Sequence, residues 1–469
     1  MKVQKESLGV GLAVIAFVLL ICLPPPESLP PEGLRCLALF AAVFLLYLFE
    51  SISAAVISLA IVPLLVLLRI TDIKDALSGF SSTSTYLIIG SFILAEAVVK
   101  SRLGSRITYL ILLKIGTKAH QITLGIMLVN IVLAFMIPSS TARTAMMLPI
   151  CLKIAQQFSG HDRRTRFGAN LMMTLCVTNS TISAGILTST ITNPMAVEYI
   201  LNHSDKTVSF IDWMIWGMPP ALLMTVLSWV LIQLIFRPEY EEMKGGKSYI
   251  EQKLAELGPV CRDEKIALAI FGATVLLWVL GGWIGVDSTS ACLLGACALC
   301  LPKIGVLTWD DCKNNISLSV VFICSGGISL GAAMSETGAA SWMAKNIFAL
   351  LSLDSLKLWA LLIILLVVVQ FMHIVFVGTA TMANVFFPIL VGIASVAGVS
   401  AEKLILPAAM LIGGYPVIMF FNTTPSILCY DTGQVTAGDF PKLGILISVV
   451  ACAVYAACVL WYWPAMGLM

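Results

Sequence analysis

The chain has 469 residues, of which 59% are hydrophobic and only 12% are charged, and its formal net charge at pH 7 is +2. Soluble domains carry roughly 25% charged residues, so this composition excludes a soluble protein and indicates one that crosses a lipid bilayer many times. The small net charge gives no indication of a nucleic-acid partner, and we expect none.

Long apolar segments recur along the chain, beginning at residues 8–23. This segment ends at Pro24-Pro25-Pro26 without a small-residue cleavage site, so we interpret it as a transmembrane helix and not as a signal peptide. Because about 20 apolar residues span the hydrocarbon core, the pattern predicts an all-α polytopic membrane protein with about 11 transmembrane helices plus two re-entrant hairpins. The predicted order is a first transmembrane helix in 1–33, a first repeat in 34–237, a cytoplasmic linker in 238–263 and a second repeat in 264–469.

The positions of lysine and arginine predict how the chain is oriented. With a cytoplasmic N-terminus, most of the 28 basic residues fall in cytoplasmic segments, and Arg143 alone falls inside the membrane. The positive-inside rule therefore favours a cytoplasmic N-terminus and an external C-terminus in the inner membrane of the cell.

Two short polar runs, 138–144 and 378–381, interrupt apolar sequence where a membrane helix is expected. Polar groups at membrane depth are costly unless protein, water or a ligand satisfies them. Paired breaks at matching places in two halves of a polytopic chain point to a transporter binding site. We therefore predict re-entrant hairpins over 120–156 and 357–396, whose tips approach each other near the middle of the membrane.

Two further segments carry Gly, Pro and Asn and predict broken helices over 168–202 and 402–431. Similar motifs follow in the same order in both halves, and each half holds an odd number of spans plus a hairpin. The halves must then insert in opposite senses, as an inverted repeat.

The hydroxyls, side-chain amides and freed backbone groups of the four breaks suit a carboxylate substrate. A single Ser-Thr run is more often a helix-packing surface, but four paired breaks favour a binding site. The candidate substrate-binding residues are Ser139, Ser140, Thr141, Arg143, Thr188, Asn193, Gly378, Thr379, Ala380, Thr381, Asn422, Thr423, Thr424 and Pro425.

Arg143 and His373 each have two interpretations that the sequence leaves open. In the functional interpretation, Arg143 supplies positive charge near a di- or tricarboxylate or replaces a coupling cation. In the structural interpretation, it extends to the cytoplasmic face or fixes hairpin backbone. His373 is either a proton-sensitive group or a polar packing residue.

At these residues the chain resembles the divalent anion:sodium symporter family. The run 139–144 followed by Pro149 is similar to the Ser-Asn-Thr hairpin motif of that family, and most similar to the bacterial citrate, tartrate and succinate exchanger branch. Thr192-Asn193 and Asn422–Pro425 fall where the family has its unwound helices. The resemblance implies a homodimer in which a transport domain moves as an elevator against a scaffold. It also implies a small organic dianion or trianion as substrate, with sulfate in some members.

The hairpin motifs of the chain differ from those of the sodium-coupled members. Those members carry Ser-Asn-Thr in both hairpins, but here Ser140 replaces the first Asn and Gly378–Ala380 replaces the second motif. Backbone carbonyls remain, so a sodium site near Ser139, Ser140 and Thr379 is weakened and not excluded, and no other cofactor is expected. We therefore expect exchange of one carboxylate for another, with sodium-coupled dicarboxylate or sulfate symport as the alternative.

Other functional classes have weaker support. The chain has no His-Glu-x-x-His or Gly-x-Ser-x-Gly motif, and we expect no enzymatic activity. Gly246-Lys247-Ser248 lacks the first glycine of a phosphate-binding loop, which argues against an ATP-driven pump. An anion channel remains as the alternative from another class, because hairpins also line pores.

Overall fold

The computed structural model of the chain describes residues 2–26, 28–159, 164–204, 206–239, 241–243, 246–351 and 356–468. Throughout these ranges the regular structure is helical, without a strand, and one isolated antiparallel bridge joins Lys118 to Glu242. Eight of the described helices are long and apolar enough to cross a membrane, and shorter apolar helices accompany them. The all-α, multi-spanning class is therefore confirmed, whereas the number of spans stays a prediction.

In the first half, the long helix α5 (Thr83–Lys100) precedes a shorter amphipathic helix, two interrupted helix pairs and a long final helix. The elements are α1 (Lys2–Ile21), α2 (Pro31–Phe49), α3 (Ala54–Leu67), α4 (Ile73–Ala76), η1 (Ser78–Ser81), α5 (Thr83–Lys100), α6 (Leu103–Ile115), α7 (Ala119–Met136), α8 (Ser140–Ser159), α9 (Arg166–Ser183), α10 (Thr192–His203) and α11 (Phe210–Ile235).

The second half has the same order, starting from the long helix α16 (Leu318–Glu336). Its elements are α12 (Gly246–Glu256), α13 (Arg262–Ile284), α14 (Ser288–Leu299), α15 (Trp309–Asn315), α16 (Leu318–Glu336), α17 (Ala339–Leu351), α18 (Leu358–Phe371), η3 (Met372–Ile374), α19 (Thr379–Ala397), α20 (Glu402–Gly414), α21 (Thr424–Asp431), α22 (Asp439–Ala457), η4 (Cys458–Tyr462) and α23 (Trp463–Ala465). The way in which the two halves insert into a membrane stays a prediction.

The interruptions have local causes in the sequence. Pro138 disfavours helical geometry in the residue before it, and Ile137 is extended between α7 and α8. Gly378 adopts φ +105° before α19, a conformation that residues with a Cβ rarely reach. Both polar runs therefore lie where one helix ends and the next begins.

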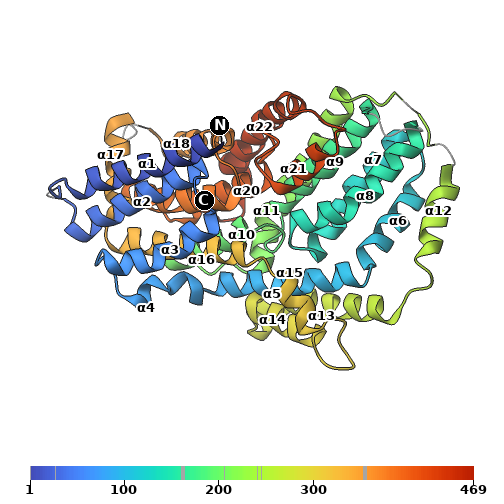
Figure 1. Cartoon of the computed structure of the whole chain (residues 1–469), viewed down its shortest axis with the longest axis horizontal. Coiled ribbons are helices and arrows are strands. Elements are labelled where there is room, and N and C mark those ends of the chain that lie inside the picture. The colour runs from blue at the N-terminus through green and yellow to red at the C-terminus, as the bar shows by residue number, and fades with distance from the viewer. Residues whose placement is uncertain are drawn as a thin grey trace.

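Helices α9 and α20 form the buried centre. Every residue from Phe167 to Ser183 in α9 is buried, and α20 is buried over nearly its whole length. Figure 1 shows α10, α11 and α20 in the middle of the molecule, with α1–α4 and α17 toward one end and α6, α7, α8 and α12 toward the other. Helices α7 and α8 pack against α9, while α19 packs against α20. Each hairpin-like pair thus lies beside the interrupted pair that follows it.

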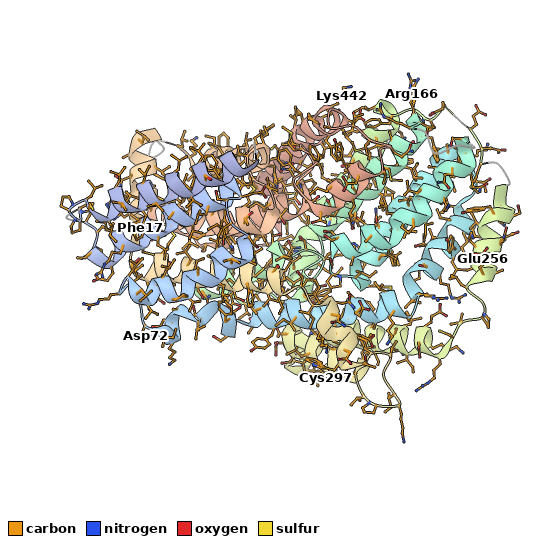
Figure 2. The ribbon with its side chains drawn as sticks, viewed as in Figure 1. Phe17, Asp72, Arg166, Glu256, Cys297 and Lys442 are labelled. Atoms are coloured by element: carbon orange, nitrogen blue, oxygen red, sulfur yellow. The ribbon has the colours of Figure 1, made fainter. Side chains whose placement is uncertain are left out.

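The outer surface carries many exposed apolar side chains on the helices. Trp283 is 84% exposed and Leu67 is 75% exposed, as expected for side chains that face lipid. In Figure 2, Arg166 and Glu256 lie in the right half and Asp72 lies at the left.

Candidate functional site

Arg143, on the first turn of α8, is completely buried and is held by groups from three segments. Its Nε donates to Asn179 Oδ1 at 2.6 Å, and its Nη1 donates to the carbonyl of Ile137 at 2.5 Å and to Ser189 Oγ at 2.8 Å. Its Nη2 donates to Ser183 Oγ at 2.5 Å. All these partners are neutral, and within the described residues no carboxylate forms an ion pair with Arg143. The site therefore contains a buried positive charge that no acidic side chain balances.

Asn179 ties the first hairpin-like pair to α9. Besides accepting from Arg143, its Nδ2 donates to the carbonyl of Ser140 at 2.8 Å and to Thr144 Oγ1 at 2.7 Å. Asn179, Ser183 and Ser189 are not among the candidates from sequence. The signal in the sequence is the run 178–194, which is rich in Ser, Thr and Asn, although only the fold shows which group each side chain meets.

Asn193 holds the break between α9 and α10. Its Nδ2 donates to the carbonyl of Ser183 at 3.0 Å and to that of Ile186 at 2.9 Å, and the residue is completely buried. These carbonyls are freed because the helix stops there. Nearby, Thr188 is 4% exposed and its Oγ1 has no hydrogen-bond partner in the structure.

Asn422 lies between α20 and α21, beside the second hairpin-like pair. Its Nδ2 donates to the carbonyls of His373 and Phe376, and its Oδ1 accepts from the backbone N–H of Met419 at 2.7 Å. Arg143 and Asn422 therefore share one role, since Arg143 donates to a single carbonyl at the first hairpin turn and Asn422 donates to two at the second. The next residue, Thr423, caps α21 by accepting from Ser426 N–H.

The second polar run forms the start of α19. Thr381 Oγ1 donates to the carbonyl of Gly378 at 2.9 Å, and Thr379 and Ala380 are half-buried on the first turn. His373 is buried, with Nδ1 2.8 Å from the carbonyl of Gln370 and Nε2 3.2 Å from that of Ile412. These contacts support packing in the fold, and a proton-sensitive role stays a prediction.

The first polar run also lies at the start of a helix, α8, but its hydroxyl bond has the opposite direction. Ser139 Oγ accepts from the backbone N–H of Ala142 at 3.2 Å. Ser140 and Thr141 are half-buried on the first turn of the helix. Of the remaining candidates, Pro425 is buried and Thr424 is exposed.

The two interrupted pairs touch each other directly. A Cβ placed on Gly413 would lie 2.1 Å from Thr192 Oγ1 and 2.8 Å from Thr190 Cγ2, so only glycine allows this approach. Helix α21 also packs against α8 and α9. Contacts therefore run from the first hairpin-like pair through α9–α10 and α20–α21 to the second pair. The direct approach of the two tips stays a prediction.

Comparison with known proteins covers almost the whole chain. The family model for the sodium:sulfate symporter transmembrane region matches residues 4–469. The chain is 24% identical over 468 residues to the putative malate transporter YflS of Bacillus subtilis, covering 98% of this chain and 96% of the relative. It is 25% identical over 484 residues to the sodium-dependent dicarboxylate transporter SdcS of Staphylococcus aureus, covering 98% and 91%.

Two solved transporters have a similar fold. The YdaH transporter of Alcanivorax borkumensis matches with a TM-score of 0.55 and 12% identity over 99% of this chain and 98% of that one. MtrF of Neisseria gonorrhoeae matches with a TM-score of 0.58 and 13% identity over 98% and 94%. At this identity the likeness concerns the fold.

Proposed function

Because the chain belongs to the sodium:sulfate symporter family of membrane transporters, and so to a family of carriers and not of enzymes, we propose that it exchanges di- or tricarboxylates across the inner membrane. Relatives named as malate and dicarboxylate transporters support a carboxylate substrate. We further propose that it works as a homodimeric elevator, with its N-terminus in the cytoplasm.

The observation that carries the exchange proposal is the buried, unpaired charge of Arg143. A charge kept from water is costly, and one inside a membrane protein usually marks a functional site. A bound dianion would compensate this charge, so the loaded site moves through the protein more readily than the empty one. Slow return of the empty site is the condition for obligatory exchange.

The hairpin tips supply the groups for a carboxylate. The first turns of α8 and α19 present free backbone N–H groups, and helix N-termini favour anions. Half-buried residues at these turns, Ser139–Thr141 and Gly378–Ala380, add hydroxyl and backbone donors. We assign substrate contact to these turns and a positioning role to Asn193 and Asn422.

Sodium-coupled symport is the alternative, and it is supported by the relative SdcS, which is named a sodium-dependent dicarboxylate transporter. Sodium requires oxygen ligands, but several oxygens near the first tip already accept hydrogen bonds. The carbonyl of Ile137 accepts from Arg143, that of Ser140 accepts from Asn179, and Ser139 Oγ accepts from Ala142. The guanidinium also repels a nearby cation. These residues therefore fit a sodium ion poorly at the first tip, while Thr379 at the second tip keeps the symport alternative open.

The test is transport by the purified protein in liposomes. We expect labelled succinate or malate to enter only liposomes loaded with a dicarboxylate, at equal rates in sodium and choline buffers. Uptake into empty liposomes on a sodium gradient would contradict exchange and support symport. Flux that neither saturates nor shows counterflow would support a channel.

Arg143→Gln tests the role of the charge. We expect this variant to lose exchange, whereas Arg166→Gln, which removes an exposed arginine, should transport normally. Full exchange by Arg143→Gln would remove the basis of the proposal.

A further inference from the structure

We propose that the pocket between α5 and the segment 188–191 is a specificity subsite that recognises a hydroxyl group on the transported carboxylate. The inference rests on the proposed function and extends it, because it names the kind of carboxylate that the site prefers. Thr188 is the residue that would make the contact.

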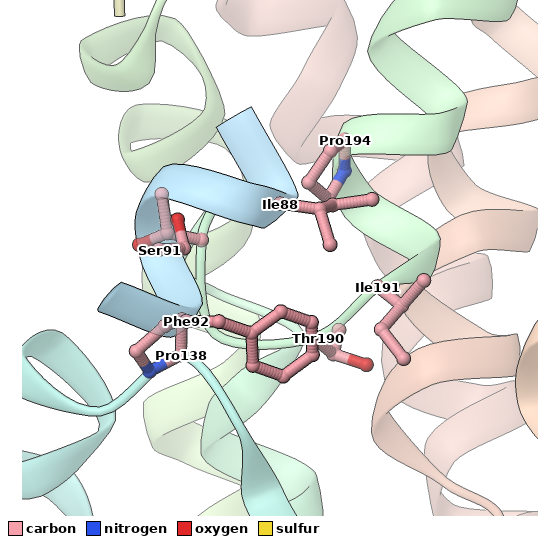
Figure 3. A pocket seen from close by; sticks show the side chains of 8 residues that line it. Ile88, Ser91, Phe92, Pro138, Thr190, Ile191 and Pro194 are labelled. Atoms are coloured by element: carbon pink, nitrogen blue, oxygen red, sulfur yellow. The ribbon is translucent and has the colours of Figure 1, made fainter. Parts of the chain in front are cut away.

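The pocket lies where α5 meets the first tip and the first broken pair. It is lined by Ile88, Ser91, Phe92, Pro138, Thr188, Thr190, Ile191 and Pro194. Figure 3 shows Ile88 and Phe92 extending from α5 toward Thr190 and Ile191. The enclosed space has room for about one water-sized group, so it can take a hydroxyl and not the carbon chain of an organic acid.

Two lining residues of the pocket are chain neighbours of groups that hold Arg143. Pro138 follows Ile137, whose carbonyl accepts from the guanidinium, and Thr188 precedes Ser189, whose hydroxyl also accepts from it. A substrate whose carboxylate lies at the first tip, near this charge, would therefore have its adjacent carbon atoms beside the pocket.

The lining favours a neutral polar group over a second carboxylate. No charged side chain is among the eight lining residues. Thr188 Oγ1 is buried and has no partner, a costly condition unless a ligand or water completes its hydrogen bond. Ser91 Oγ lies 3.6 Å from Cys292 Sγ, which is a weak partner, so it also has capacity for a stronger one.

The apolar residues of the lining add a size limit. The ring of Phe92 and the side chain of Ile191 line the same pocket as the Thr188 hydroxyl. A hydroxyl on a C4 acid would fit between the tip and these side chains, whereas a further carboxymethyl branch would meet the ring. The pocket thus predicts a preference for malate and tartrate over succinate, and weak transport of citrate.

The test compares substrates in counterflow with the full-length protein in liposomes. For the wild type we expect a KM for malate at least about tenfold below that for succinate, because a buried hydroxyl is left unsatisfied when the substrate lacks one. Thr188→Val keeps the shape and removes the hydroxyl, so it should bring the two KM values together. Thr188→Ser should retain the preference.

A matched control is Ser228→Ala, which removes another buried hydroxyl without a partner, on α11 and outside the pocket. It should leave the ratio of the two KM values unchanged. If Thr188→Val does not fold, Phe92→Ala decides, because enlarging the pocket should increase the uptake of citrate relative to succinate.

An equal KM for malate and succinate in the wild type would overturn the inference. An unchanged ratio of these two KM values in Thr188→Val would also overturn it. Where Thr188→Val does not fold, an unchanged uptake of citrate relative to succinate in Phe92→Ala would do so. These results leave the proposed function standing, since carboxylate exchange would still be observed. If the wild type transports no carboxylate at all, the proposed function itself fails.

Discussion

Replacing Asn422 by alanine tests whether one side chain holds the second hairpin tip in place. The substitution removes two bonds donated to the carbonyls of His373 and Phe376 and one accepted from Met419 N–H. Asn422 is 1% exposed, so water does not easily replace these bonds. Each backbone group left unsatisfied costs about 1 kcal/mol or more, which gives a loss of about 3 kcal/mol for the three.

This loss should act first on the tip itself. Because a change of about 1.4 kcal/mol is a factor of ten, local opening of residues 373–378 should become about 100-fold more frequent. Hydrogen exchange measured by mass spectrometry should show faster exchange in this segment, with little change in residues 137–142. We also expect carboxylate exchange to be lost.

Asn346→Ala is the matched control. Asn346 is exposed on α17, and its side chain makes one local bond to the carbonyl of Trp342. It should change stability by less than about 0.5 kcal/mol. Asn422→Asp should be more damaging than Asn422→Ala, since a carboxylate would face two carbonyl oxygens. If residues 373–378 of Asn422→Ala exchange hydrogen at the same rate as in the wild type, the reasoning is refuted.

Two further predictions concern the first tip and the contact between the broken pairs. Ser139→Ala should lose transport because it removes the cap of α8, and Asn193→Ala because it removes the donor to two freed carbonyls. Both purified proteins should still elute as the same oligomer as the wild type. Normal uptake by either variant would remove that residue from the site. Gly413→Ala should lower the thermal stability and abolish transport, because the added Cβ would collide with Thr192. The control Gly272→Ala has nothing within 4 Å of the added Cβ, so it should leave the thermal stability unchanged or raise it slightly. A stable and active Gly413→Ala would show that the broken pairs need not approach so closely.

The sequence by itself determined the membrane class, the helical fold and the positions of the breaks. These features depend on local chemistry, since apolar runs require helices in lipid and Pro138 or Gly378 interrupts them wherever the chain folds. Candidates such as Arg143 and Asn193 were also found locally, because a polar residue stands out in an apolar run.

Only the tertiary structure decided which hydrogen-bond donor meets which acceptor. Arg143 meets Asn179, Ser183 and Ser189, which are 36 to 46 residues away along the chain, and Asn422 meets carbonyls 46 to 49 residues away. Such pairings depend on how the helices pack, and periodicity along a single helix carries no record of them. For the same reason the contribution of α5 to the pocket beside Thr188 had no signal in the sequence, since its Ser91 resembles any small residue at a helix contact.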